Sequence, residues 1–547
     1  MAFEVRERDL LGRIGKLETK SGFVETPVLL PVINPRVQPI KPSEMKALFG
    51  CEALITNAYI VQKSFGHSAA GREIHKLLDY GGVVMTDSGA YQILVYGDVE
   101  IDADEIVSFQ EQISTDIATI LDIPTGWRVS KEYANETVKE TLRRARRLWK
   151  IKERDDVLWV GPVQGGQYLE LVARSAKKMG ALPFHIHALG SPTAVMEQYF
   201  FDVLVDMVVT AKANLPVERP LHLFGAGHPF MFSLAVALGC DLFDSAAYAL
   251  FARDDRYMTE SGTARLNELE YLPCSCPVCV KNTPESMLEK PKAERQQLLA
   301  EHNLFVSFAE LRRVKQAILE GRLWEHLEMR AHAHPSLLRA LKRMKKYEDV
   351  LEKNSPVTKS SGLFFFDSVE LVRPEVVRHR KRMEEYYSPP AEAEALLLLP
   401  QTDAKPFHKS YEWHGVLSKL YQTLGEKSSI LHACFYAAPF GVVPVEVDEV
   451  YPLSQHEVVV PLDDEVIAYV AQQVAMYIAR TNYRQAVLLA DKEVWGKEIA
   501  HACEQVCKRK GIVFVNLKRE GMADKVLAER ILSALKLGER CEAGVRR

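Results

Sequence analysis

One repeating theme along residues 27–250 limits the possible folds of this chain more than any other feature. Short β-branched or apolar runs that end in small or polar residues alternate with longer segments of helical pattern. Eight such runs occur, at 27–33, 53–60, 83–89, 117–124, 158–166, 184–190, 220–227 and 240–247. The segments between them, such as 131–152 and 193–213, are long enough to be the crossover helices that parallel strands require.

This alternation predicts an α/β fold, a TIM (β/α)8 barrel, although it would also describe an open doubly wound sheet. In a barrel the chemistry belongs to the C-terminal ends of the strands. The residues that close the runs are therefore the candidates, and they include Asp87-Ser88-Gly89, Asp122, Gln164, Leu189-Gly190 and Asp244. Any one of them is as readily a turn former or a helix cap. Three carboxylates and a glutamine at one barrel mouth favour a functional site.

A cluster of cysteines follows the repeating region. Three of the nine cysteines lie at Cys274, Cys276 and Cys279, and His302 follows after 22 intervening residues. Three thiolates and one imidazole at this spacing predict a tetrahedral Zn²⁺ site with no open position for water, and therefore a structural metal. His332 and His334 also lie downstream and are alternatives to His302 as the fourth ligand.

Changes of pattern along the chain predict three parts. Residues 1–347 are expected to form the barrel with its zinc-binding insertion, 348–395 a linker and connecting region, and 396–547 a compact α/β accessory domain. The candidate strands of that last part are 396–399, 442–447, 486–489 and 511–516.

Composition adds limits on the class of protein. Hydrophobic residues make up 47% and charged residues 26%, which is typical of soluble globular proteins. No apolar run approaches the roughly 20 residues of a membrane span, and the charged start is unlike a signal peptide, so we expect a cytoplasmic protein. The net charge of −4 leaves room for local basic patches that would bind phosphates. Candidates are Arg143, Arg144, Arg146, Arg147, Lys342, Arg343, Lys345, Lys346, Arg378, Arg380, Lys381 and Arg382.

Four motifs in order give the chain a family resemblance. TDSGAYQ at 86–92, GPVQGG at 161–166, DLFDS at 241–245 and the cysteine spacing together resemble the tRNA-guanine transglycosylases over about residues 1–345. The segments 310–324 and 373–380, and the additional C-terminal α/β region, resemble the archaeal branch. The resemblance implies exchange of guanine 15 in the tRNA D-arm for 7-cyano-7-deazaguanine (preQ0), the first committed step toward archaeosine.

The chemistry and the resemblance suggest the role of each site residue. Breaking a glycosidic bond without net hydrolysis needs a nucleophile that holds the ribose, as a carboxylate does in retaining glycosidases. By position in the motifs, Asp244 would be this nucleophile and Asp87 the general acid/base. Asp122 and Gln164 match the base-reading positions. The remaining pocket residues would be Ser88, Leu189, Gly190 and Tyr91, which stands where Phe is usual in the family.

The resemblance also bears on partners. It implies a homodimer. Many archaeal members end in an RNA-binding PUA domain that we do not find before Arg547, so we expect this module to be absent or to be supplied by another polypeptide. The segment 400–414 loosely resembles a motif of archaeosine synthase, with Gln401 where that motif has Cys and Phe407 where it has Tyr. We interpret it as part of a degenerate accessory domain.

Three alternative functions differ from this one in features that the sequence would show. An archaeosine-synthase-like paralogue acting on preQ0-tRNA should lack the aspartates and the cysteine cluster, and a non-catalytic tRNA-binding subunit should lack the set of Asp87, Asp122 and Asp244. A zinc hydrolase would need an open metal position, which a Cys3His set does not leave.

Overall fold

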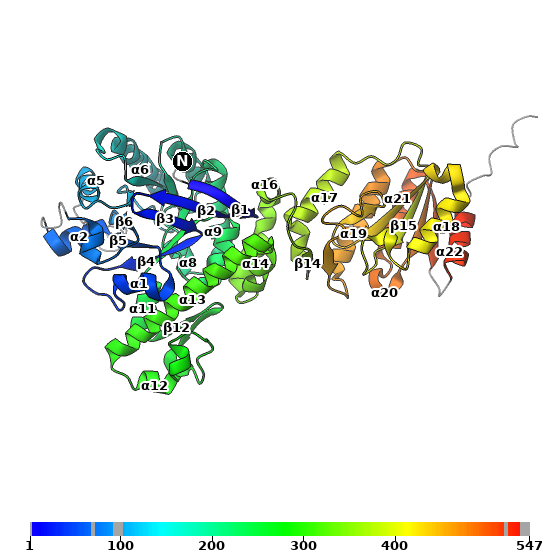
Figure 1. Cartoon of the computed structure of the whole chain (residues 1–547). Coiled ribbons are helices and arrows are strands. Elements are labelled where there is room, and N and C mark those ends of the chain that lie inside the picture. Colours follow the sequence, from blue (N-terminus) through cyan, green and yellow to red (C-terminus); the bar gives the residue numbers. More distant parts are fainter. Residues whose placement is uncertain (1–2, 67–71, 91–101, 519–522, 536–547) are drawn as a thin grey trace, which may run out of the picture. The chain divides into compact units, whose positions relative to one another are not determined.

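The computed structural model describes residues 3–66, 72–90, 102–518 and 523–535. The chain folds as two compact units, one comprising residues 1–350 and 354–356, the other 351–353 and 357–547 (Figure 1). Within the described ranges, no helix combines the length and the apolar character that crossing a membrane requires.

The first unit is a closed barrel of eight parallel strands, which confirms the barrel and excludes the open sheet. All eight apolar runs contain a barrel strand. The strands are β4 (Val28–Ile33), β5 (Ala53–Asn57), β6 (Val83–Asp87), β7 (Ile117–Thr119), β8 (Leu158–Val163), β9 (Ile186–Leu189), β10 (Leu221–Leu223) and β11 (Leu242–Ser245).

Helices connect these strands and cover the barrel. They are α1 (Pro42–Phe49), α2 (Ala58–Phe65), α3 (Ile74–Leu78), α5 (Ala103–Gln112), α6 (Lys131–Ile151), α7 (Leu169–Gly180), α8 (Thr193–Glu197), α9 (Phe201–Asn214), α10 (Phe232–Ala237) and α11 (Ala247–Arg253). In α6, Ser130 accepts the Tyr133 N–H and caps the first turn, and Val138, Leu142 and Ala145 form a buried stripe at helical spacing.

A three-stranded antiparallel sheet, β1 (Phe3–Asp9), β2 (Gly12–Thr19) and β3 (Gly22–Thr26), closes the N-terminal end of the barrel. Phe3, Leu17 and Val24 of this sheet share one apolar core with residues at the starts of the barrel strands. The Arg13 guanidinium also makes a bidentate ion pair with buried Asp241, with Nε–Oδ1 2.7 Å and Nη2–Oδ2 2.9 Å. Because this end is filled, the opposite mouth is the place for a substrate site.

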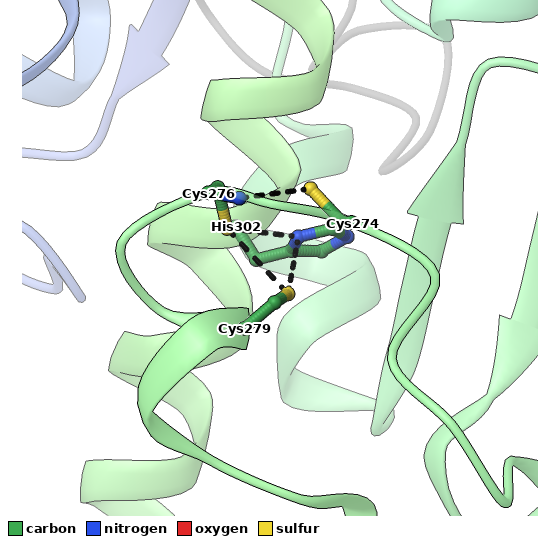
Figure 2. Close-up of side chains that lie close together, drawn as sticks. All are labelled: Cys274, Cys276, Cys279 and His302. Carbon is green, nitrogen blue, oxygen red and sulfur yellow. Dashed lines mark hydrogen bonds between the residues drawn. The ribbon is translucent and has the colours of Figure 1, made fainter.

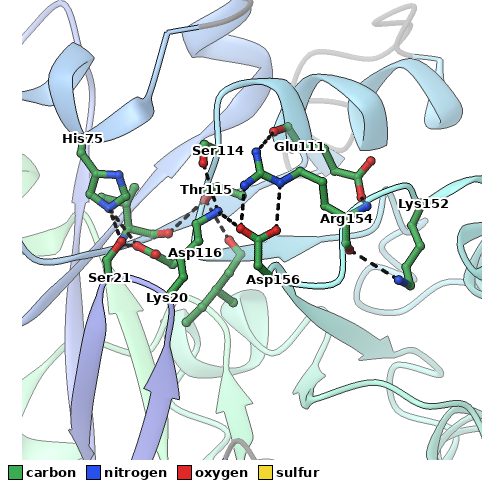
Figure 3. Close-up of polar contacts among 12 residues, drawn as sticks. Lys20, Ser21, His75, Glu111, Ser114, Thr115, Asp116, Lys152, Arg154 and Asp156 are labelled. Atoms are coloured by element: carbon green, nitrogen blue, oxygen red, sulfur yellow. Dashed lines mark hydrogen bonds and ion pairs between the residues drawn. The ribbon is translucent and has the colours of Figure 1, made fainter.

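A second polar network joins the β2–β3 turn to the same end of the barrel (Figure 3). His75 Nε2 lies 2.9 Å from Asp116 Oδ2 and 3.3 Å from Ser21 Oγ, and the Val84 N–H donates to Asp116 Oδ2. Lys20 Nζ lies 3.5 Å from Asp156 Oδ2. The hydrogen bonds from His75, Ser21 and Val84 outweigh burial and lower the pKa of Asp116.

The long helix α13 (Lys292–Glu320) packs against α11 and against the hairpin of β12 (Arg256–Thr259) and β13 (Gly262–Arg265). It begins after Pro291 and ends at Gly321, whose φ of +71° gives the left-handed cap that glycine favours. The buried side chains of α13 include His302 and Leu304, and Leu304 belongs to a core shared with Met45, Tyr257 and the cysteine loop. Short α12 (Pro284–Leu288) completes the insertion. The unit continues through α14 (Leu323–Ala331) and α15 (Pro335–Arg343).

The second unit is a five-stranded sheet of order β17-β16-β15-β19-β20. The parallel strands are β15 (Ala395–Pro400), β16 (Leu431–Ala437), β19 (Gln485–Ala490) and β20 (Val513–Lys518), and β17 (Gly441–Pro444) is an antiparallel edge. The pair α18 (His414–Leu424) and α22 (Asp524–Ala534) contributes to one apolar core, and the pair α19 (Asp464–Arg480) and α21 (Glu498–Lys510) to another.

The four candidate strands of this unit correspond to β15, β17, β19 and β20, whereas β16 was not among them. The stretch 348–395, interpreted from the sequence as a connecting region, contains β14 (Leu363–Phe365) and α17 (Pro374–Glu385). β14 pairs in parallel with β18 (His456–Val458), and this part of the stretch belongs to the second unit.

Candidate functional site

The open mouth of the barrel gathers the polar residues that close the strands. Asp87 is the last residue of β6, and Asp244 is the third residue of β11. Asp122 follows β7, and Gln164 directly follows β8. Gln164 donates a hydrogen bond to Asp122. Asp122 and Asp244 lie close enough to Asp87 to raise its pKa.

Asp87 is half-buried at this mouth. Asn57 Nδ2, at the end of the neighbouring strand β5, donates to Asp87 Oδ2 over 3.0 Å. Burial raises the pKa of Asp87 from 3.8 to about 7, repulsion from Asp122 and Asp244 adds to the rise, and the backbone N–H groups of Gly89 and Ser88 partly oppose it. A carboxyl group with this pKa can both donate and accept a proton near neutral pH, as general acid/base chemistry requires.

Asp122 and Gln164 form the second part of the site. The Gln164 carbonyl Oε1 accepts from the Thr125 N–H at 3.0 Å, from Thr125 Oγ1 at 3.0 Å and from Ser191 Oγ at 3.1 Å. These donors fix the orientation of the amide, because its NH₂ group must then face the opposite way, where it donates to Asp122 Oδ2. Burial raises the pKa of Asp122 to about 6 despite that hydrogen bond. The pair presents an acceptor and a donor side by side.

Gly190 lies against this pair. A Cβ at position 190 would come within 2.1 Å of Gln164 Nε2, so the amide occupies the space that a side chain would need. The Gly190 N–H donates to the Val163 carbonyl at 2.9 Å. Leu189 is the buried last residue of β9, and the buried Ser88 hydroxyl has no hydrogen-bond partner among the described residues. Tyr91 lies outside the residues that the structure describes.

Two donors converge on one oxygen of Asp244. His222 Nε2 lies 2.9 Å from Asp244 Oδ1, and the Gly225 N–H donates to the same oxygen over 3.0 Å. His222 comes from β10, the neighbouring barrel strand. His222 was not among the residues predicted from the sequence, because it lies inside an apolar strand rather than at its end.

The sulfur and imidazole groups of the predicted metal set lie together beside the barrel (Figure 2). The ligand atoms of Cys274, Cys276, Cys279 and His302 all lie within 4.8 Å of one another. Cys276 Sγ is 3.5 Å from Cys279 Sγ, and His302 Nδ1 is 3.5 and 3.3 Å from these two sulfurs. A tetrahedral zinc has edges of about 3.8 Å between sulfurs and about 3.6 Å between sulfur and nitrogen, so the four residues fit Zn²⁺.

The surroundings of His302 support the same conclusion. Its Nε2 lies 2.9 Å from the Met258 carbonyl oxygen, which leaves Nδ1 for a metal and is the outer contact expected of a zinc-bound imidazole. The Tyr257 ring stacks on the imidazole with 3.7 Å between ring centroids, and its hydroxyl lies 3.3 Å from Cys279 Sγ. The structure thus selects His302 over His332 and His334 as the partner of the three cysteines.

The arrangement defines the class of protein: a (β/α)8 barrel that gathers carboxyl groups at its mouth and contains a Cys3His cluster that fits a metal ion. Comparison with known proteins identifies the family. Residues 9–336 match the family described as queuine tRNA-ribosyltransferase, and residues 376–535 match a family described as a domain of unknown function.

Curated relatives agree with this match. The tRNA-guanine(15) transglycosylase of Pyrobaculum aerophilum is 46% identical over 84% of this chain and 90% of its own length. The enzyme of the same name from Methanocaldococcus jannaschii is 43% identical over 84% of this chain and 68% of its own length. That of Saccharolobus solfataricus is 41% identical over 89% of this chain and 96% of its own length. The chain belongs to the tRNA-guanine transglycosylase family, in its archaeal tRNA-guanine(15) branch.

Proposed function

We propose that this chain exchanges guanine 15 in the D-arm of tRNA for preQ0, in the archaeosine pathway, through a covalent glycosyl-enzyme intermediate. The relatives' shared name supports the tRNA position and the leaving base. The observation that supports the mechanism is that two carboxyl groups with different surroundings lie at the mouth of the barrel. Asp244 is held by two hydrogen bonds to a single oxygen, and Asp87 has its pKa raised to about 7.

The reaction balances with these two groups. Asp244 Oδ2 forms a bond to C1′ of the ribose as the bond from C1′ to guanine N9 breaks, and the electron pair of that bond stays on the base. Protonated Asp87 gives its proton to the departing guanine. Ionised Asp87 then takes a proton from the incoming base, whose nitrogen bonds to C1′ as the Oδ2–C1′ ester breaks. No water takes part in these steps, so the ribose is not left without a base.

Base recognition follows from the donor and acceptor pair. Guanine and preQ0 share an N1–H and an exocyclic amino group, which suit the Asp122 carboxylate, and a carbonyl oxygen, which suits the Gln164 amide NH₂. Thr125 and Ser191 hold the Gln164 amide in the orientation that presents NH₂. Ser88, Leu189, Gly190 and Tyr91 would line the rest of the pocket.

The metal set would hold one structural Zn²⁺. Cys274, Cys276, Cys279 and His302 occupy four positions and leave none for water, so the ion would join the cysteine loop to helix α13 and would take no part in base exchange. This role agrees with the burial of Cys276 and Cys279 in the core that also contains Tyr257, on which the buried His302 imidazole stacks.

Contacts with the tRNA backbone would involve fewer basic residues than the sequence suggested. Arg143 and Arg144 pair with Glu140, and Arg147 pairs with Asp104. Buried Arg378 pairs with Glu352. Exposed cations such as Arg146, Lys342 and Lys345 are better placed for phosphates. Two copies of the chain would form a homodimer, and sedimentation of the purified chain tests this.

Exchange of radiolabelled guanine into a tRNA transcript tests the proposed function. We expect label to enter a transcript with guanine at position 15, preQ0 to compete with it, and a transcript with adenine at position 15 to remain unlabelled. A non-catalytic subunit would bind the transcript without exchange, and a paralogue of the archaeosine-synthase type would act only on tRNA that already carries preQ0. Either of these results would refute the proposal.

A further inference from the structure

We infer that His222 is a positioning residue for the base exchange: it donates from Nε2 to Oδ1 of Asp244 and leaves Oδ2 for attack on the ribose. The inference rests on the proposed role of Asp244 as the nucleophile. Its basis is the contact between a buried histidine on β10 and the carboxylate on β11.

Both hydrogen-bond donors at Asp244 reach the same carboxylate oxygen. His222 Nε2 and the Gly225 N–H both reach Oδ1, at 2.9 and 3.0 Å. Within the described parts of the chain, the hydrogen bonds found at this carboxylate all end on that oxygen. A carboxylate with one anchored oxygen cannot rotate freely about its terminal bond, so its second oxygen is held in one direction. Such orientation of an attacking group lowers the barrier by removing rotations that the transition state would otherwise have to freeze.

The contacts of the imidazole indicate which ring nitrogen donates to Asp244. His222 is fully buried, and its Nδ1 has no hydrogen-bond partner among the described residues. An ionised carboxylate can only accept, so the proton must be on Nε2. The ring of Phe224 lies 4.7 Å from the imidazole ring between centroids and adds to its apolar surroundings.

These observations exclude an acid/base role for His222. Its Nε2 donates to Asp244, and its Nδ1 is buried without a hydrogen-bond partner among the described residues. Through the exchange, Oδ1 changes from a carboxylate oxygen to the carbonyl oxygen of the ester and back, and it can accept from His222 and Gly225 in both states. The donors are therefore in place before reaction and need no rearrangement during it, which is the condition for electrostatic preorganisation.

Two substitutions of His222 separate the donor from the ring. In His222→Gln the amide nitrogen can reach the place of Nε2, whereas in His222→Asn the shorter side chain cannot. We expect His222→Asn to lower kcat for guanine exchange about 10- to 100-fold, the effect of losing one hydrogen bond to a charged group. His222→Gln should stay within about threefold of the wild type. The KM for tRNA and the dissociation constant of the tRNA complex should stay within about twofold for both variants.

A neighbouring histidine supplies the control. His187 lies on β9, pairs in register with Leu221 and is equally buried, but is not among the hydrogen-bond partners of Asp244. His187→Asn should cost stability without lowering kcat in the folded enzyme. If His222→Asn does not fold, His222→Met takes its place, because methionine fills a similar volume without a donor. Melting temperatures of all variants are measured first.

The outcomes distinguish this inference from the proposed function. A folded His222→Asn or His222→Met variant with wild-type kcat would overturn the inference, as would a His222→Gln variant as slow as His222→Asn. A change in KM with unchanged kcat would also overturn it, because it would indicate a role in binding. Asp244→Asn is assayed in parallel: if that variant still exchanges guanine, the proposed function fails at the nucleophile, whatever the His222 variants do.

Discussion

Replacing Asp87 by Asn should stabilise the protein at pH 8 while abolishing base exchange. Burial and the neighbouring carboxylates raise the pKa of Asp87 from 3.8 to about 7, so the ionised form is disfavoured in the folded state. This shift corresponds to a loss of about 4 kcal/mol in the free energy of unfolding between pH 4 and pH 8. Because Asp87 is only half-buried, water at the mouth will reduce the effect, and we expect Asn to raise the free energy of unfolding by about 1–4 kcal/mol at pH 8.

The raised pKa of Asp87 determines both the sign and the pH range of the change in stability. A carboxyl group whose pKa is raised by folding removes stability as the pH increases from its unfolded to its folded pKa, here from about 4 to about 7. The advantage of Asp87→Asn should therefore be largest above pH 7 and should disappear near pH 4. Urea titrations at a series of pH values measure it, with an unchanged m-value as the check that the unfolding transition is comparable.

Asp116→Asn is the matched control, because Asp116 is a buried carboxylate of the same barrel whose pKa is lowered by its hydrogen bonds. That variant should lose stability at pH 8 and approach the wild type in acid. The reasoning would be refuted if Asp87→Asn were no more stable than the wild type at pH 8, or if its advantage did not change with pH.

Three further results are expected. Cys276→Ser should lose zinc by metal analysis and should unfold around residues 270–305, since four ligands hold this region; full zinc content would contradict the site. Gly190→Ala should raise the KM for the free base with little change in tRNA affinity, because a Cβ would lie 2.1 Å from Gln164 Nε2; an unchanged KM would show that Gln164 does not read the base. In single turnovers, guanine release should slow as the pH rises above about 7, where Asp87 loses its proton; a pH-independent rate would remove Asp87 from this step.

The barrel was predictable because its signal is local. Each parallel strand is buried on both faces and appears as a continuous apolar run, and each run ends in the residues that form the mouth. The metal set was also predictable from the sequence, because three of its cysteines lie within six residues. Only the fourth ligand, His302 on helix α13, has to be brought back to them by the fold.

The parts that were not predicted depend on contacts between distant segments. The β1–β3 sheet that closes the barrel is held by Arg13–Asp241, a pair separated by 228 residues. β16 was missed because His432 interrupts the apolar run from Leu431 to Ala437 in the sequence, and the burial of this histidine depends on its contacts with the distant Tyr387 and Tyr483. The buried pair of Lys359 and Glu375 in the second unit likewise has no local signature.

The same limit applies to the site. Position in the motifs indicated Asp244 and Gln164, but not the groups that orient them. His222 lies inside the apolar strand β10, and its relevance comes from the register that sets it beside β11. The three donors to the Gln164 carbonyl come from Thr125 and Ser191, which resemble ordinary turn residues in the sequence.

The most direct test of the account is the search for a covalent bond between Asp244 and the tRNA. The enzyme is mixed with tRNA in the absence of an incoming base, quenched by denaturation, and resolved on a denaturing gel, and the adduct is digested and mapped by mass spectrometry. The account predicts an adduct whose protein part is the peptide that contains Asp244, and no adduct from Asp244→Asn. An adduct formed by Asp244→Asn, or one mapped to Asp87 or Asp122, would contradict it.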